Sequence, residues 1–471
     1  EGAMSAAFVP TFTRTLTSEG RQAAWRLGSL VVNALVLATG LVVLLGIVFA
    51  GPIVTAFAGS YAEVPGKLDL TVQLTRVMFP FLTMVAVAAA FMGMLNSLHR
   101  FFIPALSPAA FNVGSIVCTV GLFPVMPMLG LPTIMAPAIG VLVGGFGQIA
   151  AQWPSLRGEG YRYERVLDLS DEGLRQILVL MGPGVAGLAA VQINILVTTF
   201  LAANEGTGAV SWLGYAFRTM YMPIGLFGVS IATAALPTLS RHAARNDKPE
   251  MRRTISHGLR LMLMLNVPAT VGLAVLANPI IGLIFERGRF GAADTAATAA
   301  ALACYAPGLI GYSAVKIAVP SFYAQRDART PVLVSMLTVA VNLALSLTLV
   351  RVLGFKGLAL STALASLVNA TVLVWILRSR LGGLDGRRIS VAFVKIGLAA
   401  AVMGLAAWAS DTAFIAMWPS RQLLVMGARV ALSIGAALLA LDLAARALAI
   451  EEAADLRGLV TRQIGRLAGR S

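Results

Sequence analysis

Apolar runs of about 20 residues make up most of the chain, and they limit its fold more than any other feature. A helix of this length spans the ~30 Å hydrocarbon layer of a membrane. Such runs recur from residue 24 to residue 448, separated by short polar loops. Hydrophobic residues make up 58% of the chain and charged residues only 12%, values that a water-soluble globule of this size would not show. The sequence therefore predicts an all-α polytopic membrane protein.

We expect about 13 membrane helices, in two sets and a terminal pair. The first set is a partial helix at 1–16 and helices near 24–50, 69–97, 104–129 and 133–154. The second set is near 173–203, 209–240, 254–285, 297–324, 331–351 and 357–378. The terminal pair is near 391–410 and 422–448.

The two sets are copies of one another. The first residues, EGAMSAAFVPTFTR, match GVSIATAALPTLSR with Pro10 on Pro237, an offset of 237 − 10 = 227. The same offset aligns three further proline pairs: Pro52 with Pro279, Pro80 with Pro307 and Pro104 with Pro331. With 21 prolines in 471 residues, chance would align fewer than one pair. The pattern predicts two homologous six-helix bundles, the first incomplete.

This duplication predicts the domain organisation. We expect an N-terminal bundle at 1–156, a C-terminal bundle at 171–380, two additional helices within 390–448 and a basic amphipathic tail at 449–471. Projecting the start of the second set back gives 172 − 227 = −55, so we expect a longer parent protein with 14 helices. Equivalent helices lie six apart, so both halves share one orientation, and we expect a binding cavity between them near the midplane.

The net charge of +15 reflects topology, since the basic residues lie in short loops between apolar runs, as cytoplasmic loops do. We therefore expect no nucleic-acid partner. Cys118 and Cys304 lie inside apolar runs, and His99, His242 and His257 are scattered, so no disulfide framework, metal cluster or catalytic dyad is indicated. The loops expected to be cytoplasmic contain Arg14, Arg21, Arg26, Arg100, Arg157, Arg162, Arg165, Arg241, Arg245, Lys248, Arg252, Arg253, Arg326, Arg329, Arg378, Arg380, Arg387 and Arg388.

A few cations lie inside the expected spans. Arg218 follows Ala209 by nine residues, or roughly 13 Å along a helix, which places it within the hydrocarbon layer. Exposure to lipid would cost at least about 2.5 kcal/mol, so Arg218 should face protein or water. It is either a snorkelling or salt-bridged arginine or an anion site, and no acidic residue lies within one turn of it. Arg76 and Lys316 are equally open to a structural and a cavity-lining interpretation.

The terminal helices and tail carry further charges. We expect Lys395 and Arg429 to point toward a groove or the main bundle, because charges facing lipid are costly. Asp442 is expected to pair with Arg446, four residues later. The tail has an apolar face beside several arginines, so it predicts either a helix on the cytoplasmic membrane surface or a solvated one.

Three motifs carry a resemblance: EGAMSAAFVP at the start, LNSLHRFFIPALSP in the first half and FYAQRDARTPV in the second. With the duplicated bundles and two additional helices, they resemble the MurJ/MviN lipid II flippases of the multidrug/oligosaccharidyl-lipid/polysaccharide exporter superfamily, N-terminally truncated. The resemblance implies a monomeric bacterial inner-membrane carrier, not an enzyme. It would move the undecaprenyl-pyrophosphate-linked peptidoglycan precursor by alternating access in cell wall biogenesis. The last two helices would form a groove for the lipid tail among membrane lipids.

The resemblance also implies site residues. Arg218, in the pattern WxxYAxR, corresponds to a cavity arginine of the family, and Glu1, in EGA, to a cavity acid. The family's other cavity arginines precede Glu1, and Phe217 stands where some members have a carboxylate. Some members bind sodium, and the corresponding residues here would be Thr198, Asn342, Ser346 and Thr362. They include no carboxylate, and such polar residues more often bind neighbouring helices, so sodium is the less favoured reading and no other cofactor is expected.

Other functions remain open at this point. A flippase for another lipid-linked oligosaccharide would share the cationic cavity, whereas a multidrug/cation antiporter would want an acidic one. A membrane-embedded enzyme would need clustered carboxylates or histidines, which the spans do not offer. A transporter-like scaffold is the remaining alternative. A pyrophosphate group suits a buried guanidinium, which offers a planar set of donors to phosphate oxygens.

Overall fold

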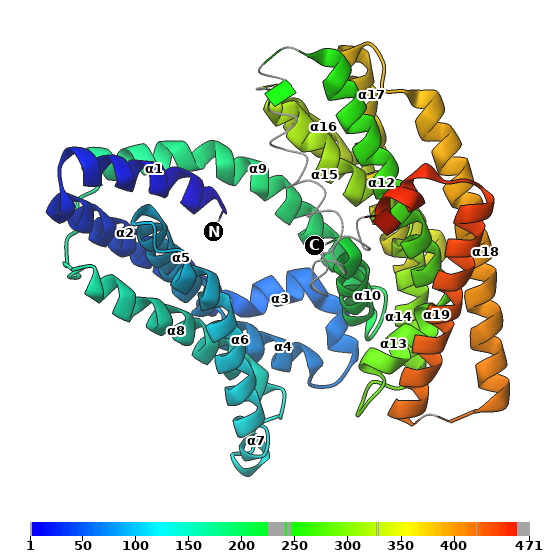
Figure 1. Ribbon diagram of the computed structural model, residues 1–471. Coiled ribbons are helices and arrows are strands. Elements are labelled where there is room, and N and C mark those ends of the chain that lie inside the picture. The colour runs from blue at the N-terminus through cyan, green and yellow to red at the C-terminus, as the bar shows by residue number, and fades with distance from the viewer. Residues whose placement is uncertain are drawn as a thin grey trace, which may run out of the picture. The chain divides into compact units, whose positions relative to one another are not determined.

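The computed structural model describes residues 2–224, 241–242, 245, 247–325, 327, 329–420 and 422–458, with side chains for all of these except 2–6 and 182–191. Every regular element in these ranges is a helix (Figure 1). Nine of the described helical segments are long and apolar enough to cross a membrane, and a bent helix pair makes a tenth candidate span. The all-α membrane architecture is therefore confirmed, while the number 13 stays a prediction.

The chain divides into two compact units, which we call unit 1 (Glu1–Ile193) and unit 2 (Asn194–Ser471). The division falls inside a helix, α9 (Glu172–Ala203), so the predicted start of the second bundle at residue 171 stays a prediction. The other helices of unit 1 are α1 (Gly2–Ser18), α2 (Arg21–Val48), α3 (Ala50–Ala58), α4 (Lys67–Met78), α5 (Phe81–Ser97), α6 (Phe102–Leu122), α7 (Val125–Met128) and α8 (Met135–Gly158), with a 3-10 turn at Gly59–Glu63.

Unit 2 contains the end of α9 and nine further described helices. These are α10 (Ala209–Pro223), α12 (Lys248–Val275), α13 (Ala277–Phe285), α14 (Ala292–Tyr305), α15 (Gly308–Ala324), α16 (Arg329–Leu353), α17 (Phe355–Leu381), α18 (Gly386–Met417) and α19 (Leu423–Ala447). The expected helix at 209–240 is confirmed only as far as α10, because residues 225–240 lie outside the described residues.

The duplication appears in the helix boundaries. Three pairs, α2 with α12, α3 with α13 and α5 with α15, both begin and end 227 residues apart (248 − 21 = 227), and α16 begins 227 residues after α6. The last pair departs from this offset, since α17 begins 220 residues after α8 (355 − 135 = 220). The loop explains the change: α7 and its turns separate α6 from α8, whereas α16 passes almost directly into α17. The 227-residue offset is therefore kept through the start of α16 and changes at the last helix.

Two expected spans contain a break at equivalent prolines. The span near 69–97 is divided into α4 and α5 at Pro80, and the span near 297–324 into α14 and α15 at Pro307, where the axis bends by 43°. Proline has no N–H to donate, and its ring collides with the preceding helical turn. The same residue therefore sets the same break in both copies.

Aromatic rings fill the core of unit 1. Phe12 packs on Trp25, and Trp25 packs on Tyr161, with ring centroids 5.7 and 5.3 Å apart. Tyr161 belongs to the extended linker after α8 and is 2% exposed. Burial raises the pKa of the Tyr161 hydroxyl, which accepts a hydrogen bond of 3.2 Å from the Ser29 hydroxyl. The linker is thereby fixed to the bundle that precedes it.

Glycines let α6 and α8 approach closely. A Cβ added to Gly140 would lie 2.8 Å from the carbonyl oxygen of Ser115, and one added to Gly144 would lie 2.6 Å from that of Phe111. Membrane helices gain their packing from such small residues, because lipid supplies no hydrophobic force between helices. Replacing either glycine would push the two helices apart.

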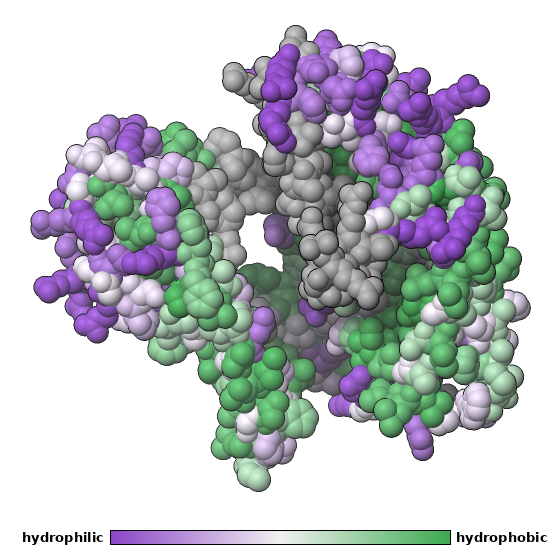
Figure 2. Space-filling model, viewed as in Figure 1, coloured by the Kyte–Doolittle hydropathy of each residue, from purple (hydrophilic) through white to green (hydrophobic). Residues whose placement is uncertain are grey.

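The outer surface of α18 and α19 is hydrophobic (Figure 2). Leu405, Trp408 and Leu439 are 67%, 62% and 68% exposed. Exposed apolar side chains along a candidate span suit contact with acyl chains. After α19 the chain turns back onto the protein, where Ile450 and Ala453 are buried in the core of unit 2. The described start of the tail therefore packs against the protein, and residues 459–471 lie outside the described residues.

Candidate functional site

A cavity of about 280 Å³ lies within unit 2; its surface is largely apolar, and we call it the polar cavity for the lysine, asparagine and hydroxyl side chains in its lining. Residues from α9, α10, α15, α16 and α17 line it: Asn194, Tyr221, Tyr312, Val315, Lys316, Thr338, Val339, Asn342, Thr362, Ala365, Ser366 and Asn369. Lysine, asparagine and hydroxyl side chains are costly inside a bilayer, so their gathering around one cavity marks a functional site by default.

Two amides of the cavity are only partly satisfied. Asn342 donates a hydrogen bond of 2.6 Å to the side-chain oxygen of Asn194, but its own side-chain oxygen is buried and accepts none in the described part of the chain. The side-chain oxygen of Asn369 is likewise buried and accepts none there. Buried polar atoms normally have partners. Both oxygens are therefore buried acceptors in the wall of the cavity, without a partner in the described part of the chain.

Lys316 is the charged residue of this cavity. It lies on α15, is exposed, and makes no hydrogen bond or ion pair with the described residues. No carboxylate lines the cavity. The ammonium group therefore adds an uncompensated positive charge to a polar cavity, which favours an anionic ligand. Of the two interpretations of Lys316 from sequence, its position supports cavity-lining.

The four predicted sodium residues are divided. Asn342 and Thr362 line the cavity, whereas Thr198 and Ser346 do not. Thr198 donates its hydroxyl to the backbone oxygen of Asn194 at 2.9 Å, and Ser346 shares a 2.7 Å hydrogen bond with Ser361. Those two hydroxyls are engaged in helix contacts, so the sodium assignment stays a prediction.

Arg218 lies on the exposed face of α10. The other face packs into unit 2 through Leu213, Ala216 and Met220, each at most 5% exposed. Arg218 is exposed and makes no hydrogen bond or ion pair with the described residues. Tyr221, one turn later on the same face, lines the polar cavity.

Aromatic residues of the motif WxxYAxR fix α10 to the neighbouring helices of unit 2. Trp212 donates a hydrogen bond of 2.9 Å to the carboxylate of Asp294 on α14, and Tyr215 packs on Phe285 with ring centroids 4.7 Å apart. Phe217, beside the arginine, contacts Tyr221 and Tyr312 at 5.6 and 6.3 Å between centroids. The aromatic residues of the motif anchor α10, and its arginine is left for another partner.

The remaining predicted site residues lie elsewhere. Glu1 is outside the described residues. Arg76, in the last turn of α4, is exposed and donates a hydrogen bond of 3.3 Å to the backbone oxygen of Ile47. Arg76 therefore supports the junction of two helices of unit 1, which favours the structural interpretation.

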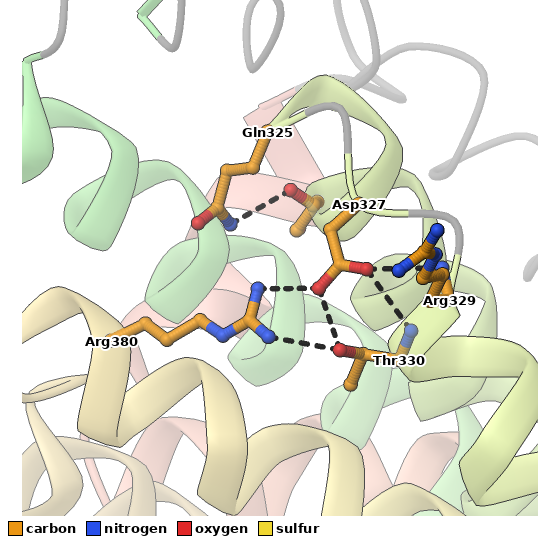
Figure 3. Close-up of polar contacts among 6 residues, drawn as sticks. Gln325, Asp327, Arg329, Thr330 and Arg380 are labelled. Atoms are coloured by element: carbon orange, nitrogen blue, oxygen red, sulfur yellow. Dashed lines mark hydrogen bonds and ion pairs between the residues drawn. The ribbon is translucent and has the colours of Figure 1, made fainter.

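The described residues of the FYAQRDARTP motif form a polar cluster at the α15–α16 loop (Figure 3). Asp327 accepts hydrogen bonds of 3.0 Å from the backbone N–H groups of Arg329 and Thr330, at the start of α16. Arg380 of α17 pairs with Asp327 at 2.6 Å and donates to the Thr330 hydroxyl at 2.9 Å. The hydroxyl and N–H of Thr330, and then Arg380, lower the pKa of Asp327. The motif ties the α15–α16 loop to the end of α17.

The terminal pair of helices contains an ion pair that sequence reasoning missed. Arg429 of α19 donates to both carboxylate oxygens of Asp411 on α18, at 2.6 and 2.8 Å. The span expected from sequence ended near residue 410 and therefore left Asp411 outside it, whereas α18 continues to Met417. Asp442 pairs with Arg446 at 2.8 Å, as predicted. Lys395 lines a cavity with Arg260 of α12, so it turns toward the bundle as expected.

Residues 1–427 match the protein-family model described as "Lipid II flippase MurJ". The chain belongs to this family. A "Probable lipid II flippase MurJ" of Vibrio cholerae is 32% identical over 431 residues, which cover 89% of this chain and 80% of the relative. A "Lipid II flippase MurJ" of Burkholderia cenocepacia is 32% identical over 384 residues, covering 81% and 74%. The resemblance stated from the motifs is confirmed, and the family is one of bacterial multi-pass transporters rather than enzymes.

Solved structures give the same fold. A lipid II flippase MurJ in an inward closed conformation matches with a TM-score of 0.76 at 24% identity, covering 95% of this chain and 89% of that one. An inward-facing multidrug resistance MATE family transporter of the MOP superfamily matches with a TM-score of 0.66 at 14% identity, covering 82% and 87%. At these identities the likeness shows the fold alone.

Proposed function

We propose that this chain moves a lipid-linked, pyrophosphate-bearing peptidoglycan precursor across the bacterial inner membrane by alternating access. Its membership of the lipid II flippase family carries the proposal. The charges of unit 2 support it, because Arg218 and Lys316 are cations without partners among the described residues, while the polar cavity has no carboxylate.

In this proposal Arg218 binds the pyrophosphate. A guanidinium group presents a planar set of donors that fits phosphate oxygens in pairs, and its charge persists at every physiological pH. Lys316 adds a second positive charge as a point contact. Tyr221 and Tyr312, which line the cavity, offer hydroxyl groups to the polar part of the substrate. Glu1 is proposed as a cavity acid from the family pattern alone.

The working unit is proposed to be a monomer, as the resemblance to the family implies. Sodium is not part of the proposed site. The hydrophobic surface of α18 and α19 is proposed to guide the lipid tail of the substrate, because it offers exposed apolar side chains along two adjacent spans (Figure 2).

Growth of a flippase-depleted bacterium tests this function. The gene carrying Arg218→Ala should fail to restore growth at a normal membrane-protein level, because Arg218 is exposed and its removal leaves no described group without a partner. Arg218→Lys should restore growth in part, since it keeps the charge but not the planar donors.

Arg429→Ala is the matched control. Arg429 is paired with Asp411, so this change leaves a carboxylate unpaired and should lower the amount or the melting temperature of the protein. Normal growth with Arg218→Ala at a normal protein level would reject the anion-site assignment.

A further inference from the structure

A second charged cavity in unit 2, of about 410 Å³, lies where α12, the start of α18 and the segment after α19 meet. Its charged lining residues are Arg260, Arg387, Arg388, Lys395, Glu451 and Glu452. It shares no lining residue with the polar cavity around Lys316. It is therefore a different cavity from the one around Lys316.

The two carboxylates of this cavity are already engaged. Arg260 forms an ion pair with Glu452, whose side chain is 4% exposed, and a second pair of 3.4 Å with Glu451. Arg387, Arg388 and Lys395 make no hydrogen bond or ion pair with the described residues. Four cations and two carboxylates line the cavity, so its lining has a formal charge of +2 (4 − 2 = 2), and three of the cations have no partner in the part of the chain that the structure describes.

These charges lie at one end of a span. Helix α18 has 32 residues and is about 48 Å long, which exceeds the ~30 Å hydrocarbon layer. Arg387 and Arg388 are in its first turn, where the helix dipole also favours an anion. Lys395 lies two turns further, on the same helical face as Arg388. We therefore expect Arg387 and Arg388 at the membrane surface and Lys395 about two turns deeper.

Apolar residues beside the cavity point to lipid. Val391, which lines the cavity, begins an exposed stripe on α18 that continues with Val394 and Leu398, at 48%, 59% and 55% exposure. A ligand with a charged head in the cavity would place an apolar chain along this stripe. Free phosphate would make no use of it.

We propose that this cavity binds the phosphate group of an anionic membrane phospholipid. Arg387 and Arg388 supply paired donors to phosphate oxygens, and Lys395 supplies a point charge at the edge of the membrane. Basic pockets between membrane helices favour such headgroups. Because Arg260 joins α12 to Glu452, a bound headgroup lies against the contact that holds the start of the tail to the bundle.

The test is binding of phosphatidylglycerol to the purified full chain in a non-ionic detergent, followed by native mass spectrometry. The variant Arg387→Gln/Arg388→Gln/Lys395→Gln should bind about 100-fold more weakly than the wild type, or about fivefold for each charge removed. The matched control is Arg245→Gln/Arg253→Gln/Arg329→Gln, which removes the same charge from exposed arginines outside the cavity. The control should bind as the wild type does.

Two further arms identify the source of the phosphate. Phosphatidylcholine, which has no net charge, should bind wild type and variant equally weakly, and inorganic phosphate should not displace phosphatidylglycerol. Displacement by inorganic phosphate at similar concentration would overturn the lipid assignment, and equal losses in the triple variant and its control would overturn the site. The single variant Arg388→Gln, at an exposed position, decides the question with its expected fivefold loss if the triple variant does not fold.

Discussion

Equivalent helices of the two copies face different surroundings: an apolar core in unit 1 and the polar cavity in unit 2. Helix α5 of unit 1 and helix α15 of unit 2 have the same length and the same boundaries at the repeat offset. At one pair of positions α5 has Ala89, which is 5% exposed in an apolar core, and α15 has Lys316, which lines the polar cavity. On the next helix Phe111 stands where Thr338 lines the cavity. The repeat preserves the backbone, and the departures from the repeat mark the candidate site.

A second comparison concerns the loops that follow these helices. Asp327 of the α15–α16 loop pairs with Arg380 near the end of α17, and Arg100 of the α5–α6 loop pairs with Glu159 just after α8, at 2.7 Å. Asp327 and Arg100 are equivalent positions (327 − 227 = 100). The loop residue is acidic in one copy and basic in the other, and it forms an ion pair in both. In both copies an ion pair therefore joins this loop to the end of the last helix or to the residue after it, with opposite polarity.

We expect the greatest change in stability when Ala89 of unit 1 is given the side chain of its equivalent in unit 2, Lys316. Ala89→Lys would bury an unpaired ammonium group in the packed core of unit 1, and should destabilise the protein by about 3–5 kcal/mol. Lys316→Ala removes an exposed charge and should change stability by about 0.5 kcal/mol at most while reducing flipping. Melting temperature in detergent and growth of a depleted strain measure the two effects. A stable, well-expressed Ala89→Lys protein would contradict the packed interior assigned to unit 1.

A smaller effect is expected at the loops. Asp327→Asn should destabilise by about 1 kcal/mol, because the carboxylate accepts two backbone N–H groups at the start of α16. The pKa of Asp327 is lowered in the folded protein, so its contribution is complete above the unfolded value of about 3.9 and is lost as pH falls toward the folded value. The difference in melting temperature between wild type and Asp327→Asn should therefore shrink below about pH 4.

Arg100→Gln is the control for that measurement. Arg100 is largely exposed and, unlike Asp327, accepts no hydrogen bond from the start of a helix. The loss of stability in Arg100→Gln should therefore be smaller, about 0.5 kcal/mol. Two results would contradict this comparison of the loops. One is a difference in melting temperature between wild type and Asp327→Asn that stays constant down to pH 2. The other is a larger loss of stability for Arg100→Gln than for Asp327→Asn.

The smallest effect is expected from sodium. Replacing sodium by potassium should leave the rate of flipping unchanged within about twofold, since the cavity has no carboxylate and already contains the ammonium group of Lys316. A strict dependence on sodium that Asn342→Ala abolishes would establish the site predicted from the family pattern, and would contradict the anionic character assigned to the ligand of this cavity.

The sequence predicts the helices and their duplication well, because apolar length and proline spacing are local properties. It also singles out Arg218, Lys316 and Asn342, which are polar residues inside apolar runs. It does not show that Asn194 and Asn369 join the same cavity, nor that Asp411 pairs with Arg429 across 18 residues. Those contacts depend on how each helix is rotated about its axis. Packing between helices sets this rotation, and the hydrophobic period alone does not specify it.

Unpaired cations of unit 2 are proposed to hold a pyrophosphate during translocation. The most direct test of this proposal is flipping of a fluorescent undecaprenyl-pyrophosphate disaccharide by purified protein in proteoliposomes, with wild type, Arg218→Ala and Arg218→Lys compared. We expect no flipping with Arg218→Ala, partial flipping with Arg218→Lys, and a melting temperature within about 2 °C of wild type for both. Wild-type flipping by a stable Arg218→Ala protein would contradict the account.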